Sequence, residues 1–203
     1  MISIFLGFIG MSMLHALIPN HWLPLITVGK MEKWKPALIY KIGLISILAH
    51  LTGTILLGLF LAMAGYSLSK EWSPFVNYIS PIILITIGLI YLLLPTHQHH
   101  FENKKLNALR SNPKNWMWVF MLSMFLSPCL QIEGLFLAAG AYGIPFMCLC
   151  TIAYISFSCI GVMFVIWASL NGFDFIKASK IEKYQTKLIG LLLIAIGVYT
   201  III

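Results

Sequence analysis

Long apolar runs, separated by short polar or basic segments, dominate the pattern along the chain. A helix needs about 20 apolar residues to cross a bilayer, and five of the six runs reach that length. The last run is shorter and is expected to begin one turn earlier, within 183–187. The six runs are approximately 2–28, 37–64, 74–94, 116–141, 145–170 and 188–203. They predict an all-α polytopic membrane protein with six transmembrane helices, in which 1–203 forms a single transmembrane domain.

The composition supports this class. The chain has 203 residues, of which 60% are hydrophobic and 9% charged. A soluble domain of this length does not need so much apolar surface. The first residues, 2–10, lack the basic start and small-residue cleavage site of a signal peptide, so we expect them to remain as the first helix. We predict a membrane transporter and no enzymatic activity.

The basic residues are distributed unevenly between the two sides of this six-helix arrangement. The net charge is +7, and of the 13 basic residues only Lys70 falls outside three loop regions. These regions are 30–41, 104–114 and 177–187. By the positive-inside rule, the three loops are expected in the cytoplasm and both termini outside, in a plasma (bacterial inner) membrane. The charge therefore predicts contact with a lipid bilayer and requires no nucleic acid. The oligomeric state stays open, a homo-oligomer included.

The two halves of the chain resemble each other. Short matches recur at an offset of 109 residues, or of 108 in one case. The matches are 84–88 with 193–197, Pro19 with Pro128, and, at the offset of 108, 50–53 with 158–161. A duplicated unit of three helices must enter the membrane in opposite senses, as in many secondary transporters. We therefore predict two inverted repeats, at 1–95 and 116–203, joined by a cytoplasmic loop at 96–115.

The stretch His15-Ala-Leu-Ile-Pro-Asn-His21 is the most unusual part of the first apolar run. On a regular helix His15 and His21 would lie about 240° apart and could not share a ligand. Proline removes a backbone donor and disturbs helix geometry, so a break at Pro19 would let the two rings meet. We predict helix breaks at Pro19, Pro24 and Pro128, with a site near the membrane midplane where the broken helices face each other.

Six residues are candidate ligands for a transition-metal ion at this site. Glu133 is the only acidic residue inside a predicted helix, where a carboxylate costs at least about 2.5–3.5 kcal/mol. Cys129, four residues earlier, would share its face on a regular helix. Imidazole suits Ni, Co, Zn, Cu and Fe, and a thiolate or carboxylate would add charge. The candidates are His15, Asn20, His21, His50, Cys129 and Glu133. The ion is a substrate, and no resident cofactor is expected.

His50 and the three histidines of the cytoplasmic loop each have an alternative interpretation. A single buried histidine usually bonds a backbone carbonyl or a hydroxyl, and for His50 alone this is an equal alternative. His97, His99 and His100 would form a metal-collecting loop at the cytoplasmic mouth, although a solvated loop explains them better.

The stretch His15–His21 resembles the His-x4-Asp-His signature of the nickel/cobalt permeases and the related urease-accessory-type membrane proteins, in the LysE/CcdA-like transporter superfamily. The similarity continues at 49–53 and 56–58, and Ser127-Pro128-Cys129 resembles the start of that group's second repeat. The resemblance implies a permease for a divalent transition metal, with His15 and His21 as transport-site ligands. Asn20 stands in place of the signature's Asp, and Ile18 where an acidic residue often lies, so Glu133 is expected to supply the charge.

Two alternatives remain open. The CcdA-like thiol-disulfide electron conduits carry a Pro-Cys element in each repeat, and Pro128-Cys129 matches the second. In the first repeat Asn20 follows Pro19, so the partner cysteine is missing, although another such as Cys159 would serve. The other alternative is a non-transporting accessory membrane protein that binds metal and delivers it to a maturing enzyme.

Overall fold

The computed structural model describes residues 1–71, 74–93, 113–172 and 178–202. Within these ranges every regular element is helical and no strand occurs, which confirms the predicted all-α class. The elements are α1 (Ile2–Ala16), α2 (Pro19–Met31), α3 (Pro36–Glu71), a π-helical turn η1 (Phe75–Ile79), α4 (Ser80–Leu93), α5 (Pro113–Phe125), α6 (Leu130–Gly140), α7 (Ile144–Leu170) and α8 (Ala178–Ile202).

Three helical stretches of the described chain are long and apolar enough to cross a membrane. These are Ile2–Met31, which contains α1 and α2, then α3, and α7. The pair α5 and α6, bent by 51° at the break between them, counts as a fourth if it is one span. Asn77–Leu93 and Lys187–Ile202 are shorter apolar helices. The structure thus agrees with a membrane protein of three to four such spans, and the count of six transmembrane helices stays a prediction.

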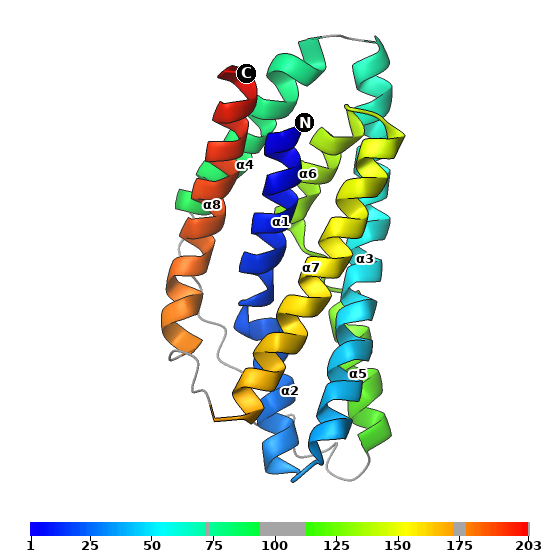
Figure 1. The fold of residues 1–203 in the computed structure, drawn as a ribbon, viewed down its shortest axis with the longest axis vertical. Coiled ribbons are helices and arrows are strands. Elements are labelled where there is room, and N and C mark those ends of the chain that lie inside the picture. Colours follow the sequence, from blue (N-terminus) through cyan, green and yellow to red (C-terminus); the bar gives the residue numbers. More distant parts are fainter. Residues whose placement is uncertain (72–73, 94–112, 173–177, 203) are drawn as a thin grey trace.

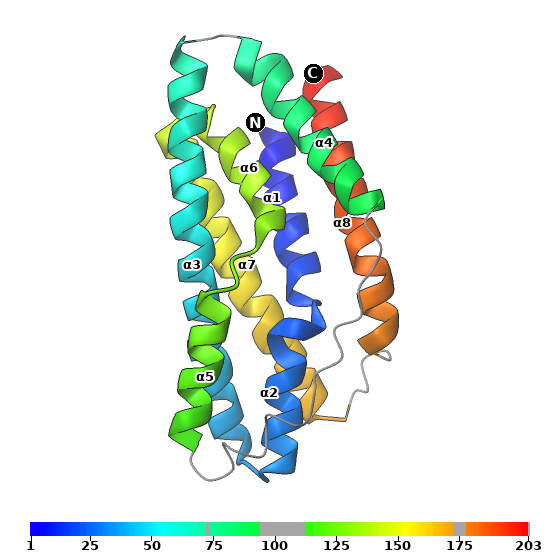
Figure 2. The same cartoon turned by 180° about the vertical axis from the view of Figure 1, so that it is seen from behind.

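The helices form an elongated bundle in which successive segments alternate in direction (Figures 1 and 2). α1, α2, α4 and α7 run away from the end that holds both termini, and α3, α5, α6 and α8 run toward it (Figure 1). α3 packs against α5 and α6, α7 packs against α1 and α2, and α4 packs against α8. Each interrupted helix therefore lies beside one long, continuous helix.

The centre of the bundle is filled by large side chains from α1, α6 and α7. The rings of Phe8 and Phe136 meet edge to face with centroids 5.0 Å apart, and Phe136 meets Tyr154 at 6.1 Å. All three side chains are fully buried. Such close packing at the middle of the helices holds the two interrupted helices in fixed positions against their long neighbours.

Small residues bring α3 and α6 into close contact. A methyl group added at Gly140 would collide with the backbone of Ala62, and one at Gly65 would collide with the carbonyl oxygen of Leu137. Helices in membranes associate through such small-residue seams because lipid supplies no hydrophobic drive between them. The seam formed by Ala62, Gly65, Leu137 and Gly140 thus sets the distance between these two helices.

Most of the described lysines lie at one end of the bundle. Lys30 lies in the last turn of α2, Lys41 follows the start of α3, and Lys114 lies in the first turn of α5. These helix ends meet at the end of the bundle opposite the two termini, whereas Lys70 lies at the end of α3 on the termini side (Figure 1). This separation agrees with the charge asymmetry of the sequence.

Candidate metal centre

The break between α1 and α2 positions two histidines. α1 ends at Ala16 and Pro19 begins α2, because proline suits the first helical turn, whose backbone donors have no partners inside the helix. Ile18 between them is extended, with ψ of 118°. His15 therefore lies in the last turn of α1 and His21 in the first turn of α2. Pro24 lies inside α2, which continues to Met31, so it ends no helix.

Three imidazole rings from three helices meet at this break, and we call them the trihistidine cluster: His15, His21 and His50. The ring centroids are 4.3 Å apart for His15 and His21, 4.6 Å for His21 and His50, and 5.1 Å for His15 and His50. One ring nitrogen from each residue lies within 4.8 Å of the others. His15 and His50 are each 1% exposed, and His21 is half-buried.

The nitrogen positions suit a metal ion. The Nε2 atoms of His15 and His50 are 3.1 Å apart. Two nitrogens bound at about 2.0–2.1 Å lie roughly 3.3 Å apart at a tetrahedral angle and about 2.9 Å apart at a right angle. Nδ1 of His21 is buried and has no hydrogen-bond partner within the described chain. The spacing of the ring nitrogens thus fits a three-nitrogen metal site, and the unpaired nitrogen of His21 leaves that ring without a structural hydrogen bond at this atom.

The chain matches no protein-family model, no curated protein and no solved structure. Function is therefore inferred from the site and the helix arrangement.

One face of α3 holds the second break, between α5 and α6. Nδ1 of His50 lies 3.2 Å from the carbonyl oxygen of Met124, near the end of α5. The hydroxyl of Thr54, one turn further along α3, accepts a hydrogen bond of 3.1 Å from the backbone N–H of Cys129. Carbonyls at a helix C-terminus and N–H groups at an N-terminus lack partners within the helix. His50 and Thr54 supply one partner at each end of the break.

Replacing Thr54 with valine is expected to lower the free energy of unfolding by about 1–3 kcal/mol, because the N–H of Cys129 would be left buried without an acceptor. Thermal unfolding of the purified protein in detergent measures this change. Thr52→Val is the matched control, since the exposed Thr52 hydroxyl bonds only to Leu48 in its own helix. Equal melting temperatures for the two variants would show that the hydrogen bond from Cys129 to Thr54 does not stabilise the break.

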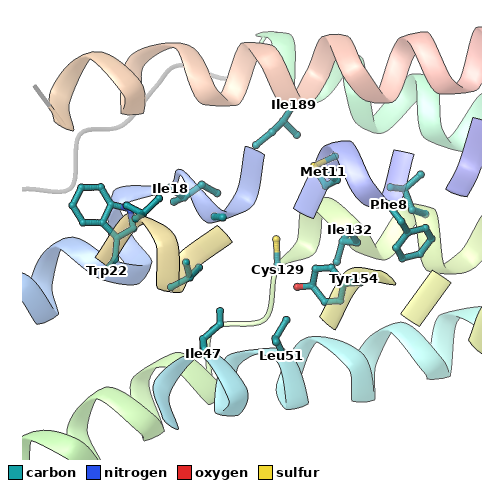
Figure 3. Close-up of a cluster of buried hydrophobic side chains, with 14 of the residues drawn as sticks. Phe8, Met11, Ile18, Trp22, Ile47, Leu51, Cys129, Ile132, Tyr154 and Ile189 are labelled. Carbon is teal, nitrogen blue, oxygen red and sulfur yellow. The ribbon is translucent and has the colours of Figure 1, made fainter. Parts of the chain in front are cut away.

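Cys129 contacts the trihistidine cluster from outside. Its Sγ lies 3.2 Å from Nδ1 of His15, the ring nitrogen that does not face His50, and 3.4 Å from Oε1 of Gln131. The side chain is 7% exposed and sits just before α6, with its sulfur directed away from α3 (Figure 3). Cys129 therefore meets the back of one imidazole and does not share the space between the three rings.

Of the remaining predicted ligands, Glu133 does not join the cluster. Glu133 in the first turn of α6 is 5% exposed, and neither carboxylate oxygen has a hydrogen-bond partner among the described residues. It is not part of the group with metal-ligand spacing. The backbone of Asn20 belongs to α2, but its side chain lies outside the described part of the structure. His97, His99 and His100 also lie outside the described residues.

Thr54 and the carbonyl of Met124 both support the site, and neither was predicted from the sequence. Thr54 lies four residues after His50, so helical periodicity alone places both on one face of α3. No sequence signal points to the Met124 carbonyl, because its role depends on where α5 ends. Tyr154, also not predicted, lies beside the site, with its ring centroid 6.4 Å from that of His15.

Proposed function

We propose that this protein is a membrane permease for a divalent transition-metal ion of the nickel or cobalt kind, with the trihistidine cluster as its transport site. The observation that carries the proposal is that three imidazole nitrogens lie within 4.8 Å of one another. They meet at the break where α1 ends and α2 begins. Neutral imidazole is a preferred ligand of Ni, Zn, Cu and Fe. Interrupted helices are the usual place for ion sites in secondary transporters.

A purely structural hydrogen-bond network is the simpler explanation of buried histidines. It accounts for His50, which contacts the Met124 carbonyl and the ring of His15. It does not account for His21, whose buried Nδ1 lacks a partner in the described chain, because structural networks normally pair their buried nitrogens. The unpaired nitrogen supports a site for an added ligand.

The seam between α4 and α8 supports the duplication that such a permease requires. A side chain at Gly88 would meet Gly190 and Ile194, and one at Gly197 would meet Pro81 and Ile85. Gly197 lies 109 positions after Gly88. Gly190 and Ile194 likewise lie 109 positions after Pro81 and Ile85, which is the offset seen in the sequence. The helices thus contact each other as two copies related by a twofold axis would.

The two breaks support the same relation. Gly53 of α3 packs on the end of α5 at Phe125, and Gly161 of α7 packs on the end of α1 at Ala16. These pairs also match at offsets of 108 and 109 residues. With the alternating helix directions, we propose six membrane-crossing segments in two inverted repeats, with α1–α2 and α5–α6 as the matched broken helices. The lysine-rich end would face the cytoplasm of a bacterial inner membrane.

The ligand set we propose carries no negative charge. Asn20 stands where the resembling permeases have an aspartate, and Glu133 is not part of the cluster. An ion held by neutral donors is held less tightly, which favours release on the far side of the membrane. We infer that Glu133 acts on transport from outside the ligand set, and that Glu133→Gln slows flux more than it weakens binding.

Flux into liposomes tests the permease. The full chain is reconstituted, and uptake of Ni²⁺, Co²⁺ and Zn²⁺ is measured for the wild type, His21→Ala and the control Thr52→Val, whose side chain is exposed on the bundle surface. We expect flux of at least one ion in the wild type and control, and none in His21→Ala. Binding in detergent without flux would identify a metal-delivery accessory protein.

The electron-conduit alternative has a different signature. It requires Cys129→Ser to abolish function while His21→Ala is tolerated, because thiol exchange uses the sulfur and not the imidazoles. An absence of both binding and flux with every metal would overturn the proposed permease function.

A further inference from the structure

Hydrogen bonds link Cys129 through His15 and His50 to a carbonyl of α5, and each group in this chain donates to the next. A carbonyl oxygen only accepts, so Nδ1 of His50 donates to Met124, and with a neutral ring Nε2 of His50 is an acceptor. Nε2 of His15, 3.1 Å away, must then donate to it, which makes Nδ1 of His15 an acceptor. The thiol of Cys129, 3.2 Å from that atom, is the donor at the start of the chain.

This placement of the ring hydrogens prevents His15 from binding an ion through Nε2, although the positions of the nitrogen atoms suit a metal. Nε2 of His50 already presents a lone pair toward the other rings, and its Nδ1 is held by a carbonyl, as is typical of a metal-binding histidine. Nε2 of His15 carries a hydrogen and cannot bind a cation. For His15 to become a ligand through this atom, its hydrogen must be carried by Nδ1 instead. Nδ1 would then need an acceptor, and its neighbour is the sulfur of Cys129.

We propose that Cys129 is not a ligand of the transport site, and that its thiol changes hydrogen-bond partner when a metal ion binds. Without metal, its S–H donates to Nδ1 of His15. With metal, the S–H turns to Oε1 of Gln131, 3.4 Å from the sulfur, and the sulfur accepts from the Nδ1–H of His15. Cys129 and Gln131 are thus positioning residues that set the tautomer of His15. This inference rests on the proposed metal site.

The proton balance of this exchange closes. Before binding, Cys129 carries one proton, His15 one on Nε2 and His50 one on Nδ1. After binding, Cys129 still carries one, His15 one on Nδ1 and His50 one on Nδ1. No proton is released, and no oxidant or reductant is needed. Ligation by a thiolate would instead release one proton for each ion bound.

Titration of the full chain in detergent with Co²⁺ distinguishes these cases. At about pH 8, where free imidazole is neutral, calorimetry in two buffers of different ionisation enthalpy is expected to give close to zero protons released per ion. The near-ultraviolet sulfur-to-cobalt charge-transfer band is expected to be absent. Release of one proton together with that band would make Cys129 a ligand, which overturns this inference and leaves the metal site intact.

Variants test the positioning role. Cys129→Ala is expected to weaken Co²⁺ binding by about 10- to 100-fold, as for other groups that orient a ligand, and Cys129→Ser, whose hydroxyl both donates and accepts, to restore most of it. Cys148→Ser is the matched control, because Cys148 is exposed on α7. Equal binding by Cys129→Ala and the wild type would overturn the inference.

A measurement without metal separates this inference from the metal site itself. The infrared S–H stretching band of Cys129, identified by its loss in Cys129→Ser, is expected at low frequency and to rise in His15→Ala, because the imidazole acceptor is removed. An unchanged band would overturn the inference even if no metal binds. Adding Co²⁺ is expected to raise the same band in the wild type, because the S–H exchanges an imidazole acceptor for a weaker amide acceptor, and to raise it further in Gln131→Leu, where no amide acceptor is left.

Discussion

Alanine at position 21 is expected to weaken Co²⁺ binding by more than about 100-fold while the melting temperature stays close to that of the wild type. Groups that only orient a ligand cost about 10- to 100-fold in affinity when lost, so the loss of a ligand costs more. Stability is spared because His21 is half-buried and its Nδ1 makes no hydrogen bond within the described chain. Calorimetry and thermal unfolding of the same detergent-purified protein measure both quantities.

His50→Ala provides the comparison for this prediction. It removes a ligand and also the hydrogen bond to the Met124 carbonyl, so it should lose both binding and stability. A His21→Ala protein that binds Co²⁺ as tightly as the wild type would remove His21 from the site. A His21→Ala protein that melts as early as His50→Ala would show that the ring is structural.

Alanine at position 140 is expected to lower the free energy of unfolding by about 3 kcal/mol or more, because the added methyl would collide with the backbone of Ala62. A flexible side chain can move aside, but the backbone of a packed helix cannot do so without separating α3 from α6. The shift would also disturb the break that His50 and Thr54 hold. Thermal unfolding in detergent and the yield of folded protein measure the effect.

Gly10→Ala is the matched control for the seam. The same methyl on α1 would meet only the side chain of Leu192 at ordinary contact distance, and alanine is the better helix former by about 1 kcal/mol. The control should therefore melt at or slightly above the wild-type temperature. If Gly140→Ala does the same, α3 and α6 do not pack as closely as described.

The local features of the site follow from short-range chemistry. Apolar runs become helices because a bilayer leaves each backbone group no partner except its own chain. Pro19 begins a helix because it lacks the N–H that a first turn does not need, and this break was predicted from the sequence. Pro24 was predicted as a break and is not one. Membrane helices tolerate an internal proline when neighbouring groups satisfy the freed carbonyl.

The relation between Cys129 and Glu133 shows where such reasoning stops. Their spacing of four residues would place them on one face of a regular helix. Cys129, however, precedes the first residue of α6 and is extended, with ψ of 90°, so helical periodicity does not apply between them. Cys129 turns to His15, and Glu133 is buried without a hydrogen-bond partner in the described chain.

The sequence alone determined the helical class, the positions of two interruptions and the residue types gathered near them, because these depend on neighbours along the chain. Only the tertiary structure decided that His50 joins His15 and His21, which nitrogen of His15 faces Cys129, and that Glu133 is not part of the cluster. Those outcomes depend on how α1, α3 and α6 are rotated about their axes, which close packing between distant segments fixes.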